Sequence, residues 1–212
     1  SPFNLGLDMG FLKDRITFSV AYFHKKTSDM IFAVPLSRAQ GNTSVYKNIG
    51  EMVNKGVELT FNAKIVDNEG DGFKWSLGAN FTTLKNKVTK LYGGKDVISG
   101  SRIMREGEAA RTFYMKKWAG VDPQTGDPLW YVNGEGGATT NDYNKAEYGL
   151  QGSAMPTYYG GIDSKLSYNN FALSFDFTYS GGNKIVDGFA SYVNSDGRLL
   201  LNYPGYKSQI GN

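Results

Sequence analysis

The 212-residue sequence contains no cysteine and a single histidine, His24. The absence of cysteine excludes disulfide scaffolds, zinc fingers, thiol nucleophiles and iron–sulfur sites together. The charges are nearly balanced, with 23 Lys and Arg against 20 Asp and Glu, and the largest basic clusters are pairs such as Lys25-Lys26. Because a nucleic-acid surface needs a basic cluster, we expect no nucleic-acid partner.

Long apolar runs are also absent. The mean hydropathy is −0.40, and the longest wholly apolar runs are only a few residues, such as Leu199-Leu200-Leu201. These values exclude a helix that crosses a bilayer. They do not exclude a transmembrane β-strand, because such a strand faces lipid only at every second residue and keeps a moderate average hydropathy.

Strict two-residue alternation of apolar and polar side chains predicts a nearly all-β protein. The clearest strand is 171–179, where five aromatic or leucine side chains alternate with small or polar ones. No stretch carries a sustained helical stripe, so we expect helix only inside loops. The eight predicted strands span residues 3–11, 16–22, 57–65, 73–81, 113–121, 129–132, 158–168 and 171–179.

The connections between these strands alternate in length. Short turns are predicted at 12–15, 66–72, 122–128 and 169–170, and long Gly/Ser/Asn-rich loops at 25–46, 85–110, 133–156 and 181–212. In an up-and-down antiparallel meander, every second connection lies at the same end. We therefore expect all the short turns at one end of the sheet and all the long loops at the other, as in outer-membrane barrels.

A soluble antiparallel barrel or a β-sandwich would show the same alternation, because the period does not say whether the apolar face meets lipid or a protein core. Two features favour a membrane barrel, namely the loop asymmetry and the aromatic residues at strand ends. Those aromatic residues are Phe11, Tyr22, Phe23, Phe73, Tyr168, Phe171 and Tyr179.

Few residues offer catalytic or metal chemistry. His24 with Ser28 and Asp29 would be needed for a barrel esterase, but a strand-end histidine near a lipid–water boundary is the simpler interpretation. The acidic, glycine-containing runs 67–72 and 194–197 are interpreted as turns rather than calcium loops. We expect no catalytic, metal-binding or cofactor-binding residue and no cofactor.

Five segments resemble the SusC/RagA-like TonB-dependent outer-membrane transporters of Bacteroidota. These segments are residues 4–11, 15–29, 48–59, 118–128 and 156–161. The resemblance implies that residues 1–212 form part of one β-barrel domain of about 22 strands in the cell outer membrane, with about eight strands in this chain. It also implies that the signal peptide, the plug domain and the last barrel strands are absent from this chain.

The resemblance implies a nutrient importer and not an enzyme. The implied partners are TonB, through the absent plug, a SusD-like surface lipoprotein that closes as a lid, outer-membrane lipid, and an oligosaccharide or peptide cargo. The polar residues opposite the apolar stripe would then line the lumen: Asp8, Glu58, Asn62, Lys64, Lys74, Asn80, Asp163, Lys165 and Asp176. The alternatives are a secreted glycan-binding β-sandwich and an outer-membrane barrel esterase.

Aromatic residues of the loops are the candidate contacts for cargo or lid. Flat amphipathic rings stack on sugars and supply contact area to a partner, although packing within the loops would also explain them. The candidates are Tyr92, Trp130, Tyr131, Tyr143 and Tyr148, with Tyr158 and Tyr159 at the base of the loops.

Overall fold

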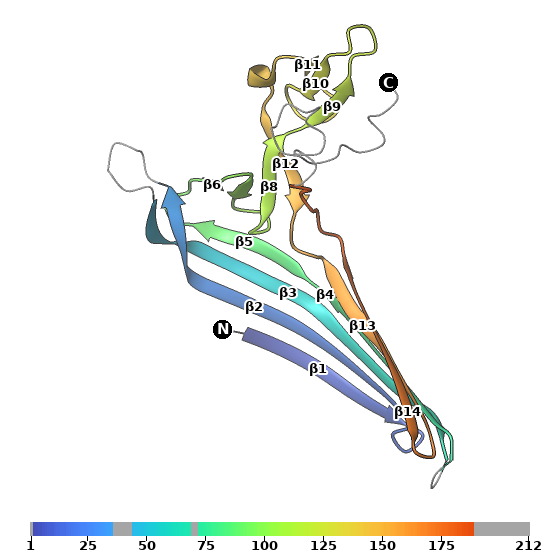
Figure 1. Cartoon of the computed structure of the whole chain (residues 1–212). Helices are drawn as coiled ribbons and strands as arrows, with labels where there is room; N and C mark the ends of the chain where they lie inside the picture. Colours follow the sequence, from blue (N-terminus) through green and yellow to red (C-terminus); the bar gives the residue numbers. More distant parts are fainter. Residues whose placement is uncertain (1, 36–43, 69–71, 189–212) are drawn as a thin grey trace.

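The computed structural model describes residues 2–35, 44–68 and 72–188, and these form one long curved sheet with a projecting arm (Figure 1). The only helical element in this part of the chain is the single turn η2 (Tyr143–Lys145), so none of its helices could cross a membrane. The strands are β1 (Pro2–Phe11), β2 (Ile16–Pro35), β3 (Ser44–Asp67), β4 (Lys74–Thr83), β5 (Lys85–Leu91), β6 (Val97–Ser99), β7 (Arg102–Met104), β8 (Thr112–Lys116), β9 (Trp118–Val121), β10 (Pro128–Tyr131), β11 (Thr139–Thr140), β12 (Tyr148–Ser153), β13 (Tyr158–Tyr168) and β14 (Phe171–Gly181).

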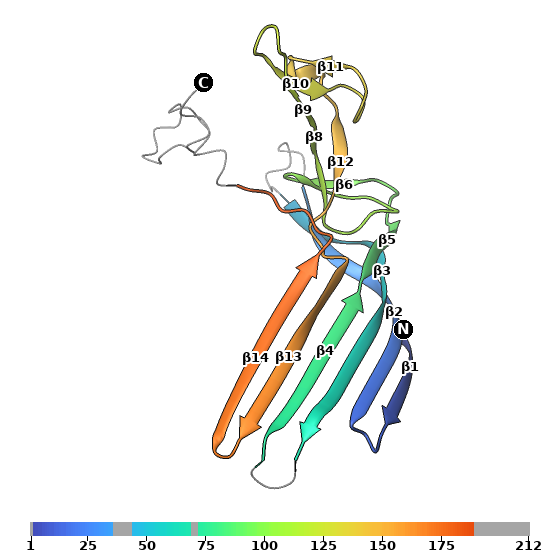
Figure 2. The same cartoon turned by 90° about the vertical axis from the view of Figure 1, so that its right-hand side faces the viewer.

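The large sheet is an antiparallel meander in the order β1-β2-β3-β4-β13-β14, and β5 pairs with the first half of β3. Its strands run side by side, with β1 and β14 at opposite edges (Figure 2). In the described residues neither edge strand pairs with a further strand, so the sheet is not closed. The predicted all-β antiparallel meander, a section of a barrel wall, is confirmed.

Register across the sheet gathers the apolar side chains on one face and the polar ones on the other. One lateral row of the apolar face runs Leu7, Val20, Leu59, Phe81, Gly160 and Tyr179. The adjacent row of the polar face runs Asp8, Ser19, Thr60, Asn80, Gly161 and Thr178. All nine polar residues predicted to share a face do so. The apolar side chains lie open to the surroundings, and Phe171 is 81% exposed.

Three of the four predicted short turns lie together at one end of the sheet, which we call the lower end (Figure 2). Leu12, Lys13 and Asp14 take left-handed φ values of 55° to 60° in the first, and Asn169 takes 50° in the last. The fourth, predicted at 122–128, was expected at the same end, and this prediction is wrong. This turn joins β9 to β10 in the projecting arm, far from the lower end of the sheet (Figure 1). The reason is that β4 pairs directly with β13, from Thr83 with Tyr158 to Lys74 with Ser167. No place in the meander is left for β9 and β10.

The strands predicted at 113–121 and 129–132 form as β8, β9 and β10, but they do not join the large sheet. They belong to two small sheets, β12-β8-β7-β6 and β11-β10-β9. The large sheet therefore has seven strands, and the arm, which comprises residues 112–153, stands on its upper end (Figure 1). Alternation identifies a strand but not its partner, which is why the sequence placed these two in the meander.

The predicted loop at 25–46 is mostly strand. β2 and β3 stay paired up to Pro35 and Ser44, and the intervening residues lie outside the described part of the chain. Two register shifts near Met30, with Asp29 at a φ of 57°, interrupt the alternation there. These bulges shift the side-chain period by one residue, so the pattern was mistaken for a loop.

A small core closes over the upper end of the sheet beside β5. Val88, Leu91 and Met104 form it, with Val97 and Ala110 against it, and Val88 is fully buried. The chain at 107–108 continues the sheet by exchanging backbone hydrogen bonds with Val88 at 2.8 and 2.9 Å. This packing fixes the loop after β5, called here the mouth loop (residues 97–111), on the polar side of the sheet.

Candidate functional site

Three indole and phenol rings meet in the arm. Trp130 packs edge-on against Trp118 and Tyr143, with ring centroids 5.7 and 5.1 Å apart. Trp118 and Trp130 face each other because they are cross-strand neighbours on β9 and β10. Trp118 and Tyr143 keep about half of their surface exposed, at 53% and 49%, so this cluster presents aromatic area outward.

A lysine joins this cluster to a second ring pair. Lys116 places its Nζ 4.1 Å from the centre of the Tyr143 ring and 5.3 Å from that of Tyr148, and it donates a hydrogen bond to the Tyr143 carbonyl at 2.5 Å. Tyr148 stacks on Tyr114 at 5.5 Å. The cation holds the two tyrosines together through their ring faces. We call these six residues the aromatic platform: Tyr114, Lys116, Trp118, Trp130, Tyr143 and Tyr148.

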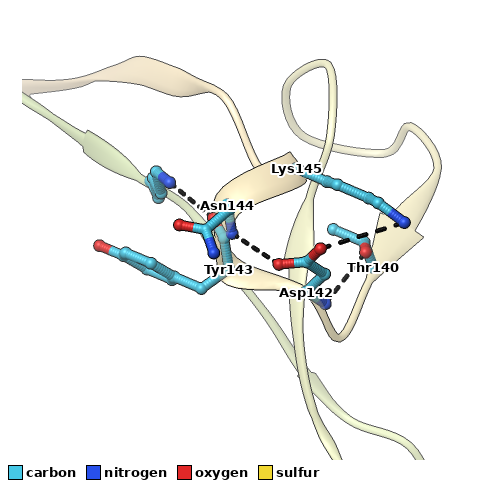
Figure 3. A network of polar contacts seen from close by, with 6 residues as sticks. Thr140, Asp142, Tyr143, Asn144 and Lys145 are labelled. Carbon is cyan, nitrogen blue, oxygen red and sulfur yellow. Dashed lines mark hydrogen bonds and ion pairs between the residues drawn. The ribbon is translucent and has the colours of Figure 1, made fainter.

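The turn that carries Tyr143 is built by Asp142 (Figure 3). The Asp142 carboxylate accepts a hydrogen bond from the Asn144 backbone N–H at 2.9 Å, which caps η2. The backbone N–H of Asp142 donates a hydrogen bond to the Thr140 hydroxyl at 3.1 Å, and the Lys145 Nζ lies 4.0 Å from the Asp142 carboxylate. This short-range network fixes the direction in which Tyr143 leaves the backbone.

The structure brings three of the five candidate contacts together and separates the other two. Trp130, Tyr143 and Tyr148 belong to the platform. Tyr131 is half-buried on the next position of β10. Tyr92 follows β5 at the edge of the large sheet, under the Lys90 ammonium at 5.4 Å.

Sequence reasoning missed Tyr114, Lys116 and Trp118 as platform members. Their spacing of two residues along β8 and β9 places them on one face, and this signal was available. The strand predicted at 113–121 had placed all three residues in the barrel wall instead.

A cavity of about 800 Å³ lies between the mouth loop and the upper part of β3. Its walls are mainly apolar, with three methionines, and Arg102 and Arg111 are its two charged lining residues. Its lining residues are Met52, Asn54, Asn86, Val97, Ser99, Gly100, Ser101, Arg102, Ile103, Met104, Ala110, Arg111 and Met155. Since none of them is acidic or aromatic, the cavity is apolar with positive charge.

Asn86 fastens the mouth loop to the wall of this cavity. Its side-chain oxygen accepts a hydrogen bond from the Ala110 N–H at 2.8 Å, and its amide donates to Asn54 at 2.7 Å. Next to the cavity, Arg105 is paired with Asp96 at 2.7 Å. This hydrogen-bonded pair raises the pKa of Arg105 above its ordinary value, so Arg105 is a cation already neutralised by its partner.

The histidine-based catalytic site does not assemble. His24 lies on the apolar face of β2 between Phe3 and Lys55, and Asp29 accepts a hydrogen bond from Asn48 at 2.6 Å. In the part of the chain that the structure describes, no hydrogen bond links His24 to Ser28 or Asp29. The described residues also contain no group of three His, Cys, Asp or Glu side chains that could hold a metal ion. The acidic run at 67–72 is only partly described, and the run at 194–197 lies outside the described residues.

Comparison with known proteins agrees with this architecture. A family model described as "TonB dependent receptor-like, beta-barrel" matches residues 3–202. The chain is 31% identical over 210 residues to TonB-dependent receptor P3 of Formosa agariphila, covering 87% of this chain and 20% of that protein. It is 32% identical over 208 residues to TonB-dependent receptor SusC of Bacteroides thetaiotaomicron, covering 90% and 20%. The chain thus spans about a fifth of the length of these relatives.

The same likeness holds in three dimensions. A structure of the RagAB peptide transporter superposes with a TM-score of 0.84 at 30% identity, covering 94% of this chain and 23% of that one. A structure of the RagAB peptide importer in its open-open state matches with a TM-score of 0.74 at 33% identity, covering 86% and 20%.

Proposed function

This chain belongs to the TonB-dependent receptor-like β-barrel family, and we propose that it forms part of the wall and of the outer rim of a nutrient importer in the cell outer membrane. The observation that carries the proposal is the division of the large sheet into one apolar and one polar face. An apolar face without a protein layer on it suits lipid, and a polar face suits a wet lumen that holds a plug.

The height of the apolar face supports this assignment. Along β13 it runs from Tyr158 at the upper end to Tyr168 at the lower end. Ten residue steps at roughly 3.3 Å each, on a strand tilted by about 40°, span roughly 25 Å along the membrane normal. That height equals the apolar band of an outer-membrane barrel, with a tyrosine at each boundary as an aromatic girdle requires.

A quenching experiment on the complete barrel tests the lipid assignment. Single cysteines at Leu59 and at Thr60, in a chain that has no native cysteine, can each carry a fluorophore once any cysteine elsewhere in the barrel has been replaced. In vesicles doped with a lipid-borne quencher, we expect strong quenching at position 59 and little at position 60. Equal quenching at both positions would overturn the membrane proposal, and the secreted β-sandwich would then be preferred.

A soluble β-sandwich needs a second sheet packed on the apolar face. Within the described ranges that face is open, with Leu5 and Phe177 both about two-thirds exposed. The polar face is instead the one that the mouth loop covers. This arrangement favours the importer over the sandwich.

We also propose that the arm and the mouth loop handle cargo and lid. The aromatic platform stands beyond the apolar band, at the end of the sheet where long loops gather (Figure 1). Its exposed rings suit a protein partner such as a SusD-like lipoprotein. The cavity of about 800 Å³ beside the mouth loop, called here the mouth cavity, would bind the cargo. Its lining is mainly apolar, has no aromatic residue and includes two arginines, which suits a peptide better than an oligosaccharide.

A paired substitution tests the platform as the lid contact. In the complete importer, Trp118→Ala should reduce co-purification of the lipoprotein lid several-fold, since a buried tryptophan often dominates an interface. Tyr92→Ala, away from the platform, is the matched control and should leave co-purification unchanged. Loss in both variants, or in neither, would remove the platform from the interface.

Energy for transport would come from TonB through a plug that lies outside this chain. Uptake of labelled cargo that continues after TonB is deleted would contradict this role.

A further inference from the structure

Lysines gather on the outward, apolar-side face of the sheet just above the upper tyrosine girdle. Register places Lys55 of β3 directly between His24 of β2 and Lys85 of β5. The next outward row places Val53 between Lys26 and Lys87. We call Lys26, Lys55, Lys85 and Lys87 the lysine belt.

The belt side chains point away from the mouth cavity. Asn86 and Val88, the intervening residues of β5, are held on the polar side by the mouth loop. Because side chains alternate between the faces of a strand, Lys85 and Lys87 face outward. All four lysines are exposed.

This arrangement of charge is unfavourable without an anion. Lys55 and Lys85 are direct cross-strand partners, and like charges in that position destabilise a sheet. In the described part of the chain, the belt has one ion pair, Lys26 with Glu51 at 2.7 Å. The ammonium groups of the other three lysines therefore have no carboxylate partner there.

The belt lies at the height where a membrane carries its phosphates. Tyr22 and Val57 occupy the same apolar row on β2 and β3, and Lys55 lies two residues before Val57, toward the upper end of β3. Two residues on a tilted strand rise by roughly 5 Å along the normal. That step leads from the edge of the hydrocarbon to the headgroup layer.

A cavity opens beside the two opposed lysines. It holds about 500 Å³ where β4 ends and β5 begins, and Tyr22, Val57, Lys55 and Lys85 contribute to its wall. Apolar and cationic groups thus border one depression, as the junction of an acyl chain and a phosphate requires.

We propose that the lysine belt binds the phosphate groups of outer-leaflet lipids. The proposal rests on the proposed function in one respect, that the apolar face meets lipid. Exposed ammonium groups attract anionic headgroups over a short, salt-sensitive range, and the bound phosphates relieve the repulsion between Lys55 and Lys85.

The test compares two triple variants of the complete barrel in phosphatidylcholine vesicles. One replaces belt residues (Lys55→Gln, Lys85→Gln, Lys87→Gln), and the matched control replaces lysines of the polar face (Lys64→Gln, Lys74→Gln, Lys165→Gln). Both lose the same net charge. Electron paramagnetic resonance of spin-labelled phosphatidic acid and of spin-labelled phosphatidylcholine measures how strongly each lipid is immobilised by the protein.

We expect the wild-type barrel and the polar-face control to prefer phosphatidic acid by about threefold or more, and the belt variant to lose most of that preference. High salt should reduce the preference of the wild type. Immobilised lipid with no preference for phosphatidic acid, or a preference that survives in the belt variant, would overturn only the proposal that the lysine belt binds lipid phosphates. Absence of any immobilised lipid would overturn the membrane assignment as well.

Discussion

The large sheet and the mouth region, which comprises the mouth loop and the arm, are both built of antiparallel strands but are stabilised differently. Strands of the sheet are long, and the side chains of its apolar face lie open, with Phe177 67% exposed. The mouth loop and the arm have short strands with frequent turns, yet Ile103, Met104 and Phe113 are buried within them. The sheet therefore depends on its surroundings, whereas the mouth region carries its own core.

The two regions should therefore tolerate different amino-acid substitutions. A substitution in the sheet acts through the medium that its side chain meets, so two adjacent residues can differ strongly. A substitution in the mouth acts through packing and hydrogen bonds within the chain. Three substitutions test this contrast.

The largest effect is expected within the sheet. Phe61→Arg in the complete barrel should destabilise it by about 2–4 kcal/mol if the residue lies near mid-membrane, because a charge there faces lipid. The neighbouring change, Asn62→Arg, should cost far less because residue 62 belongs to the polar face with Thr17 and Gly78. Chemical unfolding of the barrel in lipid measures both values.

Equal destabilisation by the two arginines would break the contrast between the faces. Phe61→Leu is the control, since it keeps an apolar side chain and should change stability by a much smaller amount than Phe61→Arg.

A smaller and more local effect is expected at the mouth. Asn86→Ala removes the acceptor of the partly buried Ala110 N–H, and because a fully buried unpaired donor costs about 1–3 kcal/mol, we expect a cost at the lower end of that range. Hydrogen exchange of the mouth loop should accelerate accordingly while that of β13 and β14 stays unchanged. Asn86→Asp keeps the acceptor and should preserve protection of Ala110. Faster exchange throughout the large sheet would show that the mouth is not an independent unit.

The smallest effect is expected in the arm. Asp142→Ala removes the cap of η2, a loss of about 1 kcal/mol. Tyr143 should then move more freely, which spectroscopy of a fluorinated tyrosine at that position would detect. Asp142→Asn retains the capping oxygen and should keep the signal sharp. A sharp signal in the alanine variant would mean that Lys116 alone orients the ring.

Sequence reasoning succeeded where one periodic rule governs the chain. Phe171 to Tyr179 alternate without a break, and β13 and β14 pair along their whole length. Turn residues such as Asn169, which tolerates a left-handed backbone, also marked hairpin positions correctly. The family resemblance agreed with the comparisons over most of the chain.

The sequence was less informative where pairing is non-local. Thr83 and Tyr158 are far apart in sequence but adjacent in the sheet, and alternation carries no information about such partners. Bulges at Met30 hid the upper part of β2 for a related reason. The spacing of Tyr114, Lys116 and Trp118 places these three on one face, but their meeting with Tyr148 depends on the pairing of Lys116 with Tyr148, which only the fold shows.

The direct pairing of β4 with β13 has a consequence for the evolution of the segment between them. After β5, residues 92–157 leave the large sheet, and the chain re-enters it at β13 beside β4. The pairing of β4 with β13 therefore keeps its register whatever the length of this segment. The entropy of closing a loop grows only logarithmically, by about 0.6 kcal/mol for each doubling of length. Insertions, deletions and exchanges in this segment therefore cost the sheet little, and selection can diversify the arm while the strands of the sheet stay the same.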